Sequence, residues 1–325
     1  MLATPKSEID LRCTVRTDTW TGRDLHVDCN SGFVFRVLAD DHDFTVENHL
    51  RDELLQGAAA RFRQDFSTPS VATLEHTYQT LTDGEVDTAI QQAQQAFADW
   101  RQTSIEERAA KVERLVELFE ANVEELAAIM TKEMGKPITE AREETEFCAE
   151  IFHYYATHGA KFAADQQVNE DDETVSLIQR RPVGPLLGIM PWDFPYYQIA
   201  RFASPNLMLR NTILLKHAES CPESALAMQW MMDEAGIPAG VHQNMFATHE
   251  QISQIIVHPG IQGVSLTGSE RAGAAIAEQA GKHLKKAVLE LGGSDPYVIL
   301  FSDDVKAAAA HALAVRLENT GQACN

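Results

Sequence analysis

The chain has 325 residues and a formal charge of −21, from 48 Asp and Glu against 27 Lys and Arg. This acidity excludes nucleic acid and anionic membranes as main partners, because both require a positively charged protein surface. No apolar stretch reaches about 18 residues, so no membrane span is expected. Charged residues between Lys6 and Arg12 interrupt any secretory signal.

The counts of lysine and cysteine bear on the compartment of the protein and on whether it binds a metal. Only 10 of the 27 cations are Lys, which fits either adaptation to high salt or ordinary solubility charge. The five cysteines, at positions 13, 29, 148, 221 and 324, form no Cys-x-x-Cys or Cys/His cluster typical of zinc. We therefore expect a reducing, cytoplasmic compartment, no metal, and at least one cysteine free for chemistry.

The first half of the chain predicts helices. Residues 1–76 are weakly patterned and stay unassigned, apart from a helix expected over about 47–66. Apolar residues recur at helical spacing over 86–100, and a capping box at Ser104–Glu107 opens a second helix that runs to Leu126.

Beyond this pair of helices, Gly135-Lys-Pro137 is a break, and a third helix is expected from about Thr139 to Ala164. The acidic run Glu170–Glu173 follows it. The alternation of Thr174–Arg181 predicts a strand, and Pro182–Pro185 predicts a turn.

From Leu186 onward, short apolar runs alternate with helical patterns, which indicates an α/β fold with a parallel sheet and helices on both faces. Strands are expected at Leu186–Met190, Ile213–Leu215, Gln243–Phe246, Gly263–Leu266, Ala287–Leu291 and Tyr297–Leu300. The intervening helices are expected at Ile199–Leu209, Glu223–Ala235, Glu250–Val257, Ser269–Gly281 and Val305–Thr320.

Two residues near these elements are candidates for catalysis. Cys324 follows a glycine-bearing turn, where backbone N–H groups can stabilise a thiolate nucleophile; a small buried apolar residue is the alternative. Glu290 lies among apolar strand residues, whose desolvation should raise its pKa towards that of a general base; a structural carboxylate capping nearby amides is the alternative.

Three further sites suit a ligand. Gly268 and Ser269 open a helix after a strand, where N–H groups favour a pyrophosphate, although an ordinary tight turn has the same pattern. Lys216 and Glu219 lie at the end of a strand. They suit the hydroxyls of a ribose, and a solvated strand end is the alternative. Pro191–Pro195 is a rigid loop that fixes a polar side chain or forms a packing corner.

Together these segments closely resemble the aldehyde dehydrogenase superfamily from about Thr77 to Asn325, and Glu133–Pro137 also matches. The segments are Ile189-Met-Pro-Trp-Asp-Phe-Pro195, Leu215-Lys-His-Ala-Glu219, Leu266-Thr-Gly-Ser269, Leu289-Glu-Leu-Gly-Gly293 and Gly321-Gln-Ala-Cys324. The resemblance implies a Rossmann-type cofactor domain over 77–292, with a helical lead-in and a strand excursion near 174–185. Residues 293–325 would begin a catalytic domain.

The resemblance also implies a role for each matching residue. Cys324 would form a thiohemiacetal with the aldehyde, hydride would pass to the nicotinamide, and Glu290 would activate water to hydrolyse the thioester. The other implied contacts are Gly268 and Ser269 with the pyrophosphate, Lys216 and Glu219 with the adenosine ribose, and Trp192 with the cofactor. Because Glu219 would repel a 2′-phosphate, NAD is expected over NADP.

Substrate choice is implied by Arg201 and by Leu289–Pro296, which look like the succinate-semialdehyde dehydrogenase branch. There an Arg binds the distal carboxylate, as a guanidinium suits; a helix-surface Arg is the alternative. Two departures oppose activity. Asp193 stands where the family has the Asn of the oxyanion hole, and an ionised carboxylate would repel the oxyanion, whereas a protonated one could donate to it.

The second departure is length, since the family continues well past its nucleophile and the chain ends one residue after Cys324. We expect a catalytic domain that is largely missing, together with the strand that pairs subunits in the homo-oligomers of the family. Three hypotheses follow: an aldehyde dehydrogenase by descent, an inactive dinucleotide-binding or interaction protein, and an unstable remnant without function.

Overall fold

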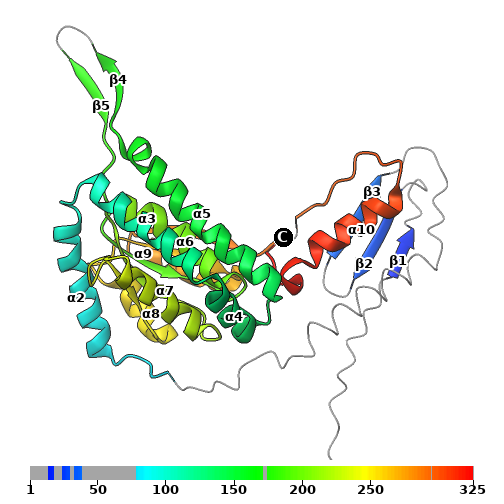
Figure 1. The fold of residues 1–325 in the computed structure, drawn as a ribbon, viewed down its shortest axis with the longest axis horizontal. Coiled ribbons are helices and arrows are strands. Elements are labelled where there is room, and N and C mark those ends of the chain that lie inside the picture. Colours follow the sequence, from blue (N-terminus) through cyan, green and yellow to red (C-terminus); the bar gives the residue numbers. More distant parts are fainter. Residues whose placement is uncertain are drawn as a thin grey trace, which may run out of the picture. The chain divides into compact units, whose positions relative to one another are not determined.

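The computed structural model describes residues 14–17, 24–29, 33–38, 78–170, 174–293 and 295–324. The chain divides into two compact units, one of residues 65–292 and one that combines 1–64 with 293–325. Figure 1 shows the elements of both.

The first unit contains α2 (Asp83–Trp100), α3 (Ile105–Ala121), α4 (Val123–Met134), α5 (Ile138–Ala163), β4 (Gln166–Glu170), β5 (Val175–Ile178), β6 (Pro185–Ile189), α6 (Pro195–Met208), β7 (Thr212–Lys216), α7 (Pro222–Glu234), β8 (His242–Asn244), α8 (His249–Val257), β9 (Gly263–Gly268), α9 (Glu270–Lys282) and β10 (Lys286–Leu291). The second contains β1 (Thr14–Thr17), β2 (Asp24–Cys29), β3 (Phe33–Leu38), α10 (Val305–Arg316) and the 3-10 turn η1 (Glu318–Gly321).

A five-stranded parallel sheet lies at the centre of residues 65–292, in the order β10-β9-β6-β7-β8. Five of the six expected strands are confirmed. The sixth, Tyr297–Leu300, is wrong, because that run is extended without pairing to any described strand. Leu300 is 83% exposed, so its apolar character reflects no burial in the described structure.

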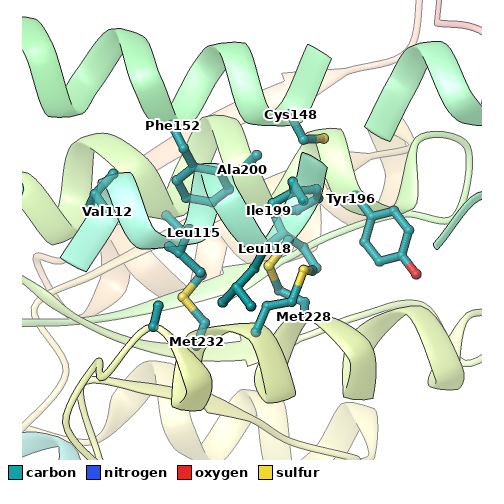
Figure 2. Close-up of a cluster of buried hydrophobic side chains, with 14 of the residues drawn as sticks. Val112, Leu115, Leu118, Cys148, Phe152, Tyr196, Ile199, Ala200, Met228 and Met232 are labelled. Carbon is teal, nitrogen blue, oxygen red and sulfur yellow. The ribbon is translucent and has the colours of Figure 1, made fainter. Parts of the chain in front are cut away.

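Helices cover both faces of this sheet because successive strand residues point to opposite sides. Ile213 and Leu215 of β7 pack in the cluster with α3 to α7, and Leu214 packs with α2, α8 and α9. Figure 2 shows the first cluster, in which Leu115, Phe152 and other side chains of α3, α5, α6 and α7 interdigitate. The α/β architecture expected from the alternating pattern is confirmed.

Several local details differ from the expectation. The helix expected over 104–126 is two helices that break at Asn122, whose side chain donates to the Leu118 carbonyl at 2.7 Å and competes with the helical backbone. The sequence predicts β5 but not its partner β4, whose residues are mostly polar.

The N-terminal zone also differs from the expectation. β1, β2 and β3 form an antiparallel sheet in a zone where no strand was expected. The helix expected over 47–66 lies outside the described residues.

Candidate active site

The candidate site lies where four adjacent parallel strands end. The register pairs Ile189 of β6 with Lys216 of β7, and Glu290 of β10 with Thr267 of β9. Ligands of open α/β sheets bind at this carboxyl edge. The segment between β6 and α6, residues 190–194, begins at the same edge and is called the Asp193 loop.

Lys216 and Glu219 place a buried ammonium beside an exposed carboxylate. The Lys216 side chain is buried, and its Nζ lies 3.6 Å from Glu219 Oε1. The Glu219 side chain is 78% exposed. The lysine is therefore fixed by the sheet while the carboxylate is free to accept hydrogen bonds, which suits the hydroxyls of a ribose.

The turn between β9 and α9 is open above its glycine. A Cβ built on Gly268 would meet only Leu266, at 3.8 Å. Ser269 caps α9, and its Oγ accepts from the Ala272 N–H at 3.3 Å. A helix start with space in front of it suits a pyrophosphate, so these residues fit a dinucleotide.

The loop after β6 presents an exposed indole and a partly buried acid. Trp192 is 42% exposed. Burial raises the pKa of Asp193 above its ordinary value, and hydrogen bonds from backbone N–H groups together with the charges of Lys136 and Arg201 act in the opposite direction. The shift is towards the protonated carboxyl, which is the form that can donate a hydrogen bond to an oxyanion.

Arg201 and Glu290 are brought together on neighbouring elements. Arg201 Nη1 lies 3.8 Å from Glu290 Oε2, and its Nη2 donates to Thr267 Oγ1 at 2.8 Å. The Glu290 side chain is 53% exposed because β10 is the edge strand of the sheet. The desolvation expected around Glu290 is therefore wrong for this structure, and a guanidinium faces the carboxylate instead.

Cys324 belongs to the other unit, whereas the remaining candidate residues lie within 65–292. It is exposed, and the backbone before it is left-handed at Asn319, Thr320 and Gly321, with φ values of 55°, 56° and 74°. Such a conformation is unfavourable for a β-branched residue like Thr320. It persists only where the surrounding structure holds it, and such residues cluster at functional sites.

Two other described cysteines are buried, and their burial makes them poor nucleophiles. Burial raises the pKa of Cys148 well above its ordinary value and that of Cys221 to about 12. Of Cys148, Cys221 and Cys324, only Cys324 is both exposed and placed in the motif that predicts a nucleophile.

The family model for the aldehyde dehydrogenase family matches residues 59–325. The chain belongs to the aldehyde dehydrogenase family. It is 45% identical over 269 residues to the succinate-semialdehyde dehydrogenase [NADP(+)] of Deinococcus radiodurans, covering 82% of this chain and 56% of that protein. It is 43% identical over 241 residues to the succinate semialdehyde dehydrogenase [NAD(P)+] Sad of Escherichia coli, covering 74% and 52%.

Solved aldehyde dehydrogenase structures share the fold. The succinic semialdehyde dehydrogenase of Streptococcus pyogenes, solved with NADP+, has a TM-score of 0.73 and 40% identity, and the match covers 77% of this chain and 55% of that one. The chain spans about half the length of the curated relatives it matches.

The described residues were also compared with what a membrane span and a metal site require. No helix within the described ranges is long and apolar enough to cross a membrane. The same ranges contain no group of three or more His, Cys, Asp or Glu side chains placed to hold a metal ion.

The sequence did not predict the residues that support the side chains and backbone of the candidate site. Thr267 holds Arg201, and Lys136, Glu144 and His217 contact the loop or helix that follows β6. Lys136, His217 and Thr267 lie in segments that resemble the family, and those segments were the available signal. The segments are Glu133–Pro137, Leu215–Glu219 and Leu266–Ser269. Glu144 lies within an amphipathic helix, where a charged residue predicts a solvated face.

Proposed function

We propose that the chain carries the cofactor site and catalytic cysteine of an NAD(P)-dependent aldehyde dehydrogenase, with succinate semialdehyde as the favoured substrate. The observation that carries this proposal is the Arg201 guanidinium, 3.8 Å from Glu290 at the carboxyl edge of the sheet. In this proposal residues 77–292 form the cofactor domain, 293–325 begin the catalytic domain, and the reaction takes place in the cytoplasm.

Cys324 is the proposed nucleophile. Its thiolate adds to the aldehyde carbonyl and forms a thiohemiacetal. Hydrogen-bond donors stabilise the oxyanion of such an adduct, and the proposed role of Asp193 is to be one of them when its carboxyl is protonated. NAD(P), when bound, supplies the hydride acceptor for oxidation of this adduct to a thioester. Glu290 then takes a proton from water, which attacks the thioester carbonyl and releases the acid and the thiolate.

Arg201 is the proposed determinant of the substrate. A guanidinium binds a carboxylate through paired charge-assisted hydrogen bonds, and succinate semialdehyde carries a carboxylate at the end remote from its aldehyde. The names of the Deinococcus and Escherichia relatives support this choice. Lys216 and Glu219 are proposed to bind the adenosine ribose, Gly268 and Ser269 the pyrophosphate, and Trp192 to contact the cofactor.

Asp193 favours a second candidate function, which is dinucleotide binding without turnover. When Asp193 is ionised it repels the oxyanion, and losing one such donor lowers kcat by about 10²–10³. Cofactor binding through Lys216, Glu219 and Gly268 does not depend on that donor.

One experiment separates the candidates. The purified chain is titrated with NAD and NADP, and NADH or NADPH absorbance is then followed with succinate semialdehyde, with Cys324→Ser as the control. Turnover that Cys324→Ser abolishes supports the dehydrogenase. Binding without turnover supports the second candidate, and a chain that neither binds nor stays in solution contradicts both.

A further inference from the structure

The start of α6 is capped by a side chain from another helix. Helices leave their first backbone N–H groups without intrahelical acceptors, and the residue before the helix usually supplies one. Here that residue is Phe194, which has no side-chain acceptor. Glu144 of α5 takes this role from outside, since its Oε1 accepts from the N–H groups of Tyr196 at 3.0 Å and Tyr197 at 2.9 Å.

The remaining donors of this first turn are also satisfied. Pro195 has no N–H, and the Gln198 N–H donates to the Phe194 carbonyl at 3.0 Å. The position of the first turn of α6 therefore depends on Glu144, which is buried and lies 52 residues before Tyr196 in the sequence.

Lys136 completes the arrangement from the turn between α4 and α5. It is 1% exposed, its Nζ bonds to Glu144 Oε2, and the same ammonium lies 3.9 Å from the centroid of the Phe194 ring. A buried carboxylate is costly without an opposite charge, and an ammonium over an aromatic face is attracted to the ring. The pair thus contacts both the helix start and the loop residue that precedes it.

We propose that Lys136 and Glu144 are positioning residues that set the place of the Asp193 loop at the candidate site. Glu144 holds the backbone that follows Asp193, and Lys136 holds the ring of Phe194 next to it. The catalytic part of this inference rests on the proposed function. The structural part does not, because it concerns the loop in the chain without cofactor or aldehyde.

Trp192 provides a direct probe of that loop. The full chain is labelled with 5-fluorotryptophan, and the ¹⁹F resonance of Trp192 is assigned with Trp192→Phe. Glu144→Ala should shift or broaden this resonance beyond the wild-type linewidth. Arg142→Ala is the matched control, since Arg142 lies on the same helix in an exposed ion pair with Glu124 and should leave the resonance unchanged.

Two double variants keep the test decisive if the single variant does not fold. Lys136→Met with Glu144→Gln removes both charges and the Lys136 contact with Phe194 but keeps an amide oxygen for the two N–H groups, so the Trp192 resonance should move less than in a variant without an acceptor. Lys136→Met with Glu144→Leu has the same charge and no acceptor, and the resonance should move. An unmoved resonance in the Leu variant overturns the proposal.

Activity gives a second readout that separates the two proposals. In a chain that turns over, Glu144→Ala should lower kcat by about tenfold or more, because losing one oxyanion-hole donor costs about 10²–10³. A fall in stability with unchanged kcat would contradict the positioning role. Absence of turnover in the wild-type chain counts against the proposed function, and the ¹⁹F result still decides the positioning role.

Discussion

Arg201 Nη1 lies 3.8 Å from Glu290 Oε2, so the residue proposed to bind the substrate faces the residue proposed to activate water. Thr267 Oγ1 holds the other arm of the guanidinium at 2.8 Å. In the proposed function one cation therefore serves two carboxylates, one from the protein and one from the substrate. Binding of the substrate carboxylate would compete with Glu290 for the guanidinium and leave Glu290 free to act on water.

Replacement of Arg201 by Leu should weaken the binding of succinate semialdehyde more than the binding of an uncharged aldehyde of equal length. Hydrogen bonds to charged groups contribute about 1.5–3 kcal/mol, which is about 10- to 100-fold in KM. The KM for butanal should stay within about twofold. Steady-state kinetics with both aldehydes measure this, with the exposed Arg271→Leu on α9 as control. Equal changes for the two aldehydes would contradict a carboxylate-binding role.

The sequence predicts the strands of the parallel sheet well, but it predicts the 297–300 segment and the contacts that support the candidate site less well. The middle of β7, Ile213–Leu215, is an uninterrupted apolar run because both faces of the strand are buried. Tyr297–Leu300 has the same character without a partner strand, so composition alone misleads. The roles of Glu144 and His217 depend on residues distant in sequence, and no local pattern reports such contacts.

Replacement of Glu219 by Gln should improve NADP binding relative to NAD. Two unit charges about 4 Å apart repel by about 1 kcal/mol in water, which is the relevant medium because the Glu219 side chain is 78% exposed. The Kd for NADP should therefore fall about fivefold, with little change for NAD. Fluorescence titration checks this. Glu234→Gln, at the far end of α7, is the control, and a similar gain there would assign the effect to overall charge.

Replacement of Asp193 by Asn should raise turnover, and the gain should grow with pH. Burial raises the pKa of Asp193, so the wild-type carboxyl donates to the oxyanion when protonated and repels it once ionised. Where the wild-type carboxyl is ionised, the variant should be about 10²- to 10³-fold faster, which is the effect of one oxyanion-hole donor. The ratio of variant to wild-type kcat, measured over the pH range in which both chains stay folded, removes the pH effects that the two proteins share. A ratio that is constant with pH would falsify donation by protonated Asp193.

His217 should make the stability of the chain depend on acid pH. It is buried directly after β7; its Nε2 lies 3.0 Å from the Pro195 carbonyl, and its Nδ1 accepts from the Ala218 N–H at 2.7 Å. That arrangement holds the neutral ring, and burial lowers the pKa of His217 from 6.5 to about 4.

The depressed pKa of His217 sets the direction of the effect. The folded chain binds this proton less well than the unfolded chain, so the stabilisation is complete above pH 6.5 and is lost as the pH falls to 4. The loss is about 3 kcal/mol for this group. Urea unfolding of wild type and His217→Gln over this range should show free energies that converge at low pH. The exposed His249→Gln should run parallel to wild type, and a parallel His217→Gln curve would show that His217 does not titrate in this window.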